Sequence, residues 1–409
     1  MDSATSRRSV ILIAACCLAA MGEGFNLQAP GVTLPVLAPL FGLSSGEGGG
    51  FAAGFFSSRS LFLSASTFGL FFGALIGGRL SDVIGRKGVV SASVALFAVF
   101  SAATILCRNA DALLWVRFAT GLGLGGALSN LLTIVSEAAG PGRRNTAMGC
   151  LYASMPAGGV VVSLLSYQFG NPAHWAVIYV IGGLIPLLAL PGLIRFAPAG
   201  VKSAAAATDR TPVGTVLFGD GRSTVTLVLW LCFLCALITQ YVLLSWLPSL
   251  LIAKGLTRPD AALVQLAFNL LGAVGSVITG VLVDGSRRIW PVAVTFLAAI
   301  IFLFVLSGAP AVLGIAALLG ALVGWTVSGS QMIAYSLAPA AYPGAMRGTG
   351  VGFAVAVGRI GATVGPLIAG SMLAAGAGVQ GVLILISALM VVAGVTACWV
   401  TVESRWRLA

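Results

Sequence analysis

An acidic residue lies deep inside the first apolar stretch of the chain, and its position suggests proton chemistry. Glu23 stands within Met21–Gly31, MGEGFNLQAPG, in an otherwise uncharged run that begins at Val10. If that run crosses a bilayer at about 1.5 Å per residue, Glu23 lies on the order of 20 Å from its start. A carboxyl group at that depth usually faces a bundle interior or a water-filled cavity, where it binds a proton or a cation. We therefore predict that Glu23 is a functional residue that binds a proton or an ion; the alternative is a helix that breaks at Gly22 and Gly24, leaving Glu23 near water.

A basic residue occupies a similar position near the end of the chain. Arg359 lies in the apolar run 347–366, RGTGVGFAVAVGRIGATVGP. A guanidinium near the membrane midplane requires a partner, and its planar fork of donors fits a carboxylate. We predict that Arg359 binds a substrate carboxylate. The structural alternative is a permanent ion pair with Glu23, or hydrogen bonds to backbone carbonyls.

Further polar side chains and aromatic rings fall inside apolar segments. Together they would suit a cavity for a flat ring that carries a carboxylate and a hydroxyl, although each one alone could simply link neighbouring helices. We select four of them as candidate substrate-binding residues: Tyr241, Asn269, Gln331 and Tyr335. The others are Phe25, Asn130, Tyr152, Gln240, Trp246, Gln265 and Phe268.

The composition defines the class of protein. Of 409 residues, 58% are hydrophobic and only 8% are charged, whereas soluble proteins carry about 25% charged residues. The net charge of +11 comes from short clusters between apolar segments, which indicates topology signals rather than nucleic-acid binding. The seven cysteines are scattered and predict neither a disulfide nor a metal site. The single histidine, His174, and the lack of a nucleophile with a positioned base argue against an enzyme, and no cofactor is expected.

Hydropathy predicts twelve membrane spans and a division into two halves. We expect an N-terminal half at 1–196, a mobile cytoplasmic linker at 197–222 and a C-terminal half at 223–409. With both termini cytoplasmic, sixteen Lys and Arg residues fall in inside loops and three in outside loops, which fixes the orientation. The predicted spans are 10–40, 55–78, 88–107, 112–138, 146–169, 174–196, 223–252, 260–284, 289–307, 311–337, 347–374 and 379–401.

An internal repeat supports the two halves. The segment GRLSDVIGRK at 78–87 recurs as GVLVDGSRR at 280–288, at a constant offset of 202 residues, and the same offset relates the Pro-Gly pairs at 141 and 343. Two loops in one register indicate two six-helix halves of parallel topology, an arrangement found in alternating-access transporters.

The motif GxLxDxxGRK between the second and third spans resembles the signature of the major facilitator superfamily, and the resemblance covers the whole chain. It implies a cytoplasmic gate formed by Gly78, Asp82, Gly85 and Arg86, with Asp82 facing the start of the eleventh span and pairing with Arg86. The gate would stabilise the outward-facing state. The alternative is a simple topology anchor.

The fourth span resembles the family motif RxxxGxGxG, which is linked to proton coupling. Its arginine is Arg117, with Gly121 and Gly125 on one helix face. Arg117 could instead extend its side chain to the outer interface. Glu137, at the other end of the span, is a further candidate for proton coupling, or alternatively a member of interfacial ion pairs.

Local sequence narrows the resemblance to the aromatic acid:proton symporters. The segments that carry it are EGFNLQAPGV, YVLLSWLPSLL, GSQMIAYSLAPAAYP and the run around Arg359. That family usually has an acidic pair, DGxD, in the first helix. Here Glu23 and Asn26 fill the two positions, so the second group is an amide that cannot titrate, and Asn26 becomes a candidate substrate-binding residue.

We therefore predict an all-α membrane protein that imports an aromatic carboxylate of the benzoate, hydroxybenzoate or phenylpropionate type together with protons. It would act by alternating access, as a monomer, in the inner membrane of a bacterium. The alternatives are a proton-coupled transporter of drugs or other organic anions, and a membrane receptor that transports nothing. A mid-membrane arginine disfavours cationic drugs.

Overall fold

The protein is helical throughout the part of the chain that can be described. The computed structural model describes residues 3–47, 50–139, 144–169, 174–197, 213–219, 221–284, 289–342 and 347–408, and these residues form no β-strand. Of the fourteen α-helices in these described ranges, α2 and α8 have six residues each, and the other twelve have between 18 and 38. The predicted all-α class is confirmed.

Each predicted span corresponds to one long helix. Among the described helices, eleven are long and apolar enough to cross a membrane. The remaining long helix, α5, has 29 residues and would extend about 43 Å, which is also sufficient. In the first part of the chain the helices are α1 (Ser3–Leu40), α2 (Gly50–Phe55), α3 (Ser58–Ile84), α4 (Arg86–Ala103), α5 (Ala110–Ala138), α6 (Arg144–Gln168) and α7 (Trp175–Phe196). They are followed by α8 (Val213–Phe218), α9 (Ser223–Ala253), α10 (Arg258–Asp284), α11 (Ile289–Gly308), α12 (Leu313–Ala340), α13 (Arg347–Ala374) and α14 (Gly378–Leu408).

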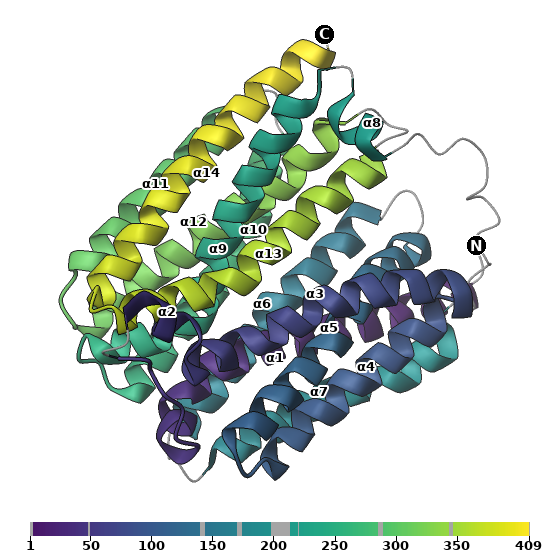
Figure 1. The fold of residues 1–409 in the computed structure, drawn as a ribbon. Coiled ribbons are helices and arrows are strands. Elements are labelled where there is room, and N and C mark those ends of the chain that lie inside the picture. Colours follow the sequence, from purple (N-terminus) through teal and green to yellow (C-terminus); the bar gives the residue numbers. More distant parts are fainter. Residues whose placement is uncertain are drawn as a thin grey trace. The chain divides into compact units, whose positions relative to one another are not determined.

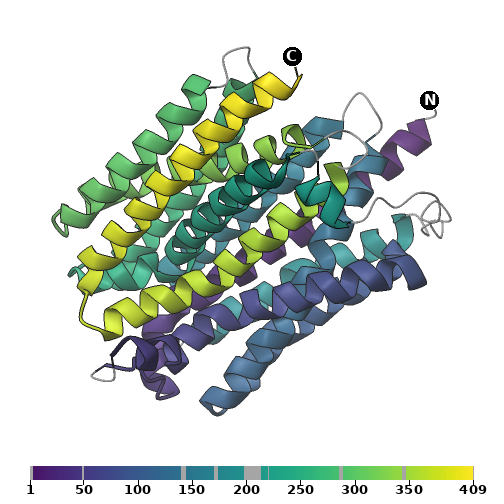
Figure 2. The ribbon, with the colours of Figure 1, turned by 45° about the horizontal axis from the view of Figure 1, so that its top comes forward.

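The helices group into two compact units. The first unit comprises Met1–Ser45 and Ser57–Ala205, and the second comprises Gly46–Phe56 and Ala206–Ala409. Within each unit the long helices run side by side (Figures 1 and 2). The segment Gly46–Phe56 lies between α1 and α3 in the sequence, inside the range 1–196, yet it packs with the second unit.

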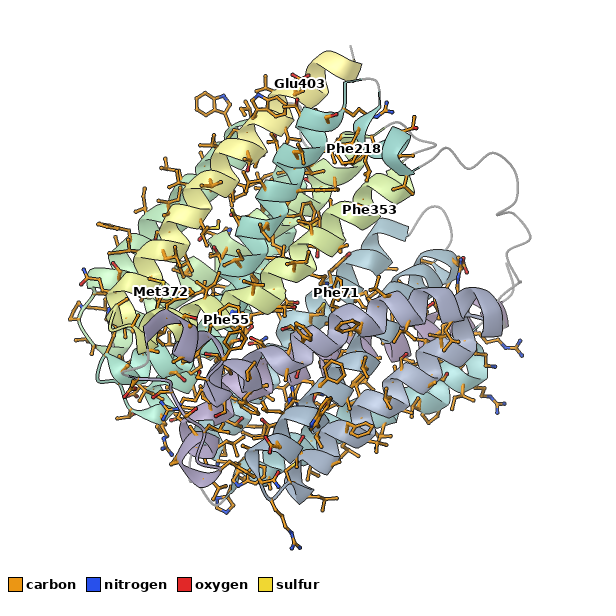
Figure 3. All side chains as sticks on the ribbon, in the orientation of Figure 1. Phe55, Phe71, Phe218, Phe353, Met372 and Glu403 are labelled. Carbon is orange, nitrogen blue, oxygen red and sulfur yellow. The ribbon has the colours of Figure 1, made fainter. Side chains whose placement is uncertain are left out.

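This segment joins the second unit because α2 approaches the α13 backbone closely. A Cβ atom on Gly54 would lie 2.7 Å from the Cα of Ser371 and 2.9 Å from the carbonyl oxygen of Gly370. Figure 3 marks the same region with Phe55 of α2 and Met372 of α13. Only a residue without a side chain permits this contact.

The last part of the expected linker, 197–222, contains a short helix. Residues 198–212 lie outside the described part of the chain, and Val213–Phe218 forms α8; the mobility of the linker stays a prediction. The buried Arg222 donates to the carbonyl oxygens of Thr215 and Val216 at the end of α8. Phe218 packs edge-on against Trp230, which stacks on Phe353 of α13 (Figure 3).

The glycines beside Arg117 in the fourth span form a close helix contact. Cβ atoms on Gly121 and Gly125 of α5 would each lie 2.1 Å from a carbonyl oxygen of α3, those of Ser66 and Leu70. Gly69 and Gly73 of α3 meet the α5 backbone in the same way. Small residues on both helices therefore allow backbone contact, as the glycine spacing predicted.

We expect Gly125→Ala to destabilise the protein by about 1–3 kcal/mol, because the added methyl group must push α3 away from α5. The measurement is the thermal midpoint of the purified protein in detergent, together with the yield of monodisperse protein. Gly352→Ala is the matched control, since a Cβ atom at this helical glycine meets nothing within 4 Å. Equal midpoints for the two variants would contradict the close contact.

Candidate functional site

Glu23 is fully buried in the first unit. It lies in α1, which continues to Leu40, so the alternative of a helix that breaks at Gly22 and Gly24 is wrong. The two flanking glycines admit neighbouring helices. A Cβ atom on Gly24 would lie 2.0 Å from the carbonyl oxygen of Met155 in α6, and one on Gly22 would lie 3.0 Å from Cδ of Pro186 in α7. The peptide units on both sides of Glu23 are therefore held closely by two other helices.

Arg117 binds a backbone carbonyl that a proline has left without its helical donor. Pro30 has no N–H, so the carbonyl of Asn26, four residues earlier, receives no hydrogen bond from it. Nη2 of Arg117 donates to this oxygen at 2.5 Å. The Arg117 side chain has no exposed surface, and its guanidinium lies 5.5 Å from the centroid of the Tyr179 ring. The alternative of a side chain that extends to the outer interface is excluded.

The Asn26 side chain has three hydrogen-bond partners, all in the first unit. Its amide nitrogen donates to the carbonyl oxygens of Gly22 (2.9 Å) and Gly182 (2.8 Å). Its amide oxygen accepts from the hydroxyl of Ser101 at 2.5 Å. Asn26 is fully buried. A substrate would have to displace one of these protein groups to reach the amide.

Sequence analysis did not select three residues that complete this cluster. They are Thr33 of α1, Ser101 of α4 and Tyr179 of α7. The hydroxyls of Tyr179 and Thr33 are 2.8 Å apart and share a hydrogen bond. Proline spacing does not locate these three hydroxyls, because the carbonyls that Pro30 and Pro186 leave free accept from Arg117 and Asn26 instead.

Within the gate motif, Gly85 is the one residue that separates α3 from α4. Gly85 ends α3 and precedes α4, with φ of 87°, a conformation that favours glycine. Next to it, Nη1 of Arg86 forms an ion pair with Glu137 at 2.5 Å, and both side chains are substantially exposed. Gly78 and Asp82 belong to α3, but the details of these two positions lie outside the described part of the chain. Glu137 is thus joined to the gate motif, and its role in proton coupling stays a prediction.

In the second unit, Arg359 hydrogen-bonds to Tyr241. Nη1 of Arg359 in α13 donates to the phenolic oxygen of Tyr241 in α9 at 2.8 Å. Arg359 is partly exposed, whereas Tyr241 is 5% exposed. Gly361 and Gly365 of α13 bring the two helices together, because Cβ atoms there would lie 2.6 and 3.0 Å from α9 carbonyl oxygens.

The other candidates of the second unit have different surroundings. The amide nitrogen of Asn269 donates to the carbonyl of Gln265 in its own helix. The Tyr335 ring packs edge-on against Phe233. Gln331 is partly exposed in α12.

Gln240, beside Tyr241, has an unused acceptor. Its side chain is 6% exposed, and its Oε1 atom is buried with no hydrogen-bond partner among the described residues. Gln240 lies three residues after Leu237 and seven after Phe233, which places all three on one helix face. Both Leu237 and Phe233 lie within 3.2 Å of a Cβ position at Gly358, the neighbour of Arg359. Sequence analysis listed Gln240 as a polar residue within a span but did not select it.

Long apolar helices in two units, each with buried polar and charged groups, define a multi-pass membrane protein with the architecture of a transporter. Residues 12–346 match the model of the Major Facilitator Superfamily, and residues 229–408 match it again. The chain belongs to this superfamily, as its motifs predicted. Solved structures support the fold: the chain resembles a bacterial homologue of the human lysosomal transporter Spinster (TM-score 0.74, 17% identity, 97% of each chain) and a D-xylose-proton symporter (TM-score 0.72, 17% identity, 93% and 96%).

Sequence comparison finds similar transporters in bacteria. The chain is 37% identical over 406 residues to the 3-(3-hydroxy-phenyl)propionate transporter of Escherichia coli K12, covering 99% of this chain and 97% of that protein. It is 30% identical to the 4-hydroxybenzoate transporter PcaK of Pseudomonas aeruginosa, covering 89% and 86%. It is also 30% identical to the gallate transporter of Pseudomonas putida, covering 90% and 86%.

Proposed function

We propose that this protein imports a hydroxylated aromatic carboxylate together with a proton, by alternating access. The observation that carries the proposal is the 37% identity, across nearly the whole chain, to a transporter of 3-(3-hydroxyphenyl)propionate. The relatives named for 4-hydroxybenzoate and gallate have substrates of the same chemistry, an aromatic ring with a carboxylate and one or more hydroxyls. We place the protein as a monomer in the inner membrane of a bacterium, with both termini cytoplasmic.

The groups of each unit support separate roles in this function. Arg359 is a cation in a partly exposed position, and Tyr241 orients its guanidinium, so the pair suits a substrate carboxylate. Glu23 is a fully buried acid in the first unit and suits proton binding. One proton per monoanion makes transport electroneutral, whereas a second proton would add about 2.3 kcal/mol of driving force per 100 mV.

Glu23→Gln is expected to abolish proton-driven accumulation of 3-(3-hydroxyphenyl)propionate in proteoliposomes, because an amide cannot carry the proton. Counterflow exchange, which needs no net proton movement, should be retained. Glu47→Gln is the matched control, since it makes the same change at an exposed acid between α1 and α2, and it should retain accumulation. Accumulation by the Glu23 variant under an inward proton gradient would show that the proton site lies elsewhere.

Arg359→Ala is expected to raise KM for the aromatic carboxylate about tenfold or more, because a charge-assisted hydrogen bond contributes about 1.5–3 kcal/mol. Initial uptake rates over a range of substrate concentrations provide the measurement. Arg359→Lys keeps the charge but not the planar fork, so its KM should fall between those of the wild type and the alanine variant. An unchanged KM in Arg359→Ala would leave Arg359 with a structural role only.

Gln240→Leu is expected to reduce the preference for hydroxylated substrates. The unused Oε1 acceptor suits a phenolic hydroxyl, and the loss of one neutral hydrogen bond corresponds to about a fivefold to tenfold change. The measurement is the ratio of kcat/KM for 3-(3-hydroxyphenyl)propionate to that for 3-phenylpropionate. The unsubstituted acid is the internal control, because it lacks the hydroxyl, and a ratio equal to that of the wild type would remove Gln240 from the substrate site.

A further inference from the structure

We propose that Asn26 is a positioning residue for Glu23: its carboxamide ties the peptide unit of Glu23 to the carbonyl that Pro186 leaves free in α7. The proposal concerns the geometry of α1 against α7, and it rests on the proposed function only in giving Glu23 the proton.

The partners of Asn26 fix the orientation of its carboxamide. The carbonyl oxygens of Gly22 and Gly182 are acceptors only, so both must face the NH2 group, and the amide oxygen must face the Ser101 hydroxyl. The carbonyl of Gly22 belongs to the peptide bond whose nitrogen is that of Glu23. The same NH2 group therefore contacts the backbone of Glu23 on one side and α7 on the other.

Pro186 makes the α7 carbonyl available. As a proline within α7 it lacks the N–H that would bond to the carbonyl of Gly182, four residues earlier. In a membrane span an unpaired carbonyl is costly, so a donor from a neighbouring helix is strongly favoured. The Pro186 ring also lies against Gly22, with Cδ 3.0 Å from a Cβ position there. One proline thus supplies both a contact and an acceptor beside Glu23.

Gly182 keeps this carbonyl accessible. A Cβ atom on Gly182 would lie 2.9 Å from the Phe25 ring and 2.9 Å from the Ser101 hydroxyl, the group that donates to Asn26. The absence of a side chain therefore allows α1, α4 and α7 to meet at one point. Asn26 connects all three helices there.

An acid at position 26 would not replace the amide. A carboxylate has no donor, and its oxygens would face two carbonyl oxygens at hydrogen-bonding distance. Asn26→Asp should therefore lower transport, rather than add a second proton site.

A double-mutant cycle tests the proposal in proteoliposomes of the full-length protein. Asn26→Ala should lower proton-driven accumulation of 3-(3-hydroxyphenyl)propionate about tenfold and shift the pH midpoint of uptake, because the backbone of Glu23 is released. In Pro186→Ala, the new N–H at position 186 bonds to the Gly182 carbonyl. In that background, Asn26→Ala should cost only about twofold, since the α7 acceptor is already paired. The double variant also serves as the folded reference if Asn26→Ala alone is unstable.

Pro191→Ala is the control background, because Pro191 lies in the same helix and frees a different carbonyl, that of Leu187. Asn26→Ala should have its full effect there. Equal losses in the Pro186→Ala and Pro191→Ala backgrounds would overturn the link through Gly182. An unchanged pH midpoint in Asn26→Ala would overturn the positioning of Glu23. Accumulation by Glu23→Gln would instead refute the proton role of Glu23, while the cycle measured on thermal midpoints would still test the Asn26 link.

Discussion

Backbone carbonyls inside a membrane must find donors, and in the first unit two prolines make this constraint decisive. Pro30 and Pro186 each leave one carbonyl without its helical partner, and a side chain from another helix takes the place of the missing N–H in both cases. Arg117 binds the oxygen freed by Pro30, and Asn26 binds the oxygen freed by Pro186. Asn26 takes part in both, since its own carbonyl is the acceptor of Arg117. The packing around Glu23 depends on these two side-chain donors, which take the place of the missing backbone N–H groups.

The fold was largely predictable because its determinants are local. Span positions follow from runs of apolar residues, and the turn at Gly85 follows from a glycine between two such runs. The burial of Glu23 follows from its distance to the nearest charged residues along the chain. These features need only the sequence within about 20 residues. The assignment of Gly46–Phe56 to the second unit needs more than this local sequence, because it depends on packing of α2 against α13, which is distant along the chain.

The partners of the site residues were not predictable in the same way. Residue type indicated that Arg117, Glu137 and Asn26 needed partners, but several helices offered candidates for each. The structure joins Glu137 to Arg86, and Arg117 to a main-chain oxygen rather than to an acid. Such choices depend on how helices distant in sequence pack, and no alternation of apolar and polar residues encodes them. The prolines are the exception, since the free carbonyl lies four residues before each one.

Two arginines within the long helices, Arg117 and Arg359, lie in different environments. Arg117 is fully buried, its Nη2 donates to a main-chain oxygen, and its remaining Nε and Nη1 groups have no hydrogen-bond partner among the described residues. The face of the Tyr179 ring lies near this charge and offsets part of the desolvation cost. Arg359 is partly exposed instead, and a phenol holds its guanidinium. Arg359 donates to a side-chain hydroxyl, whereas an anion at Arg117 would have to compete with the main-chain carbonyl of Asn26. The same residue type therefore binds main chain in one unit and a side-chain hydroxyl in the other, and we propose a substrate role only for the second.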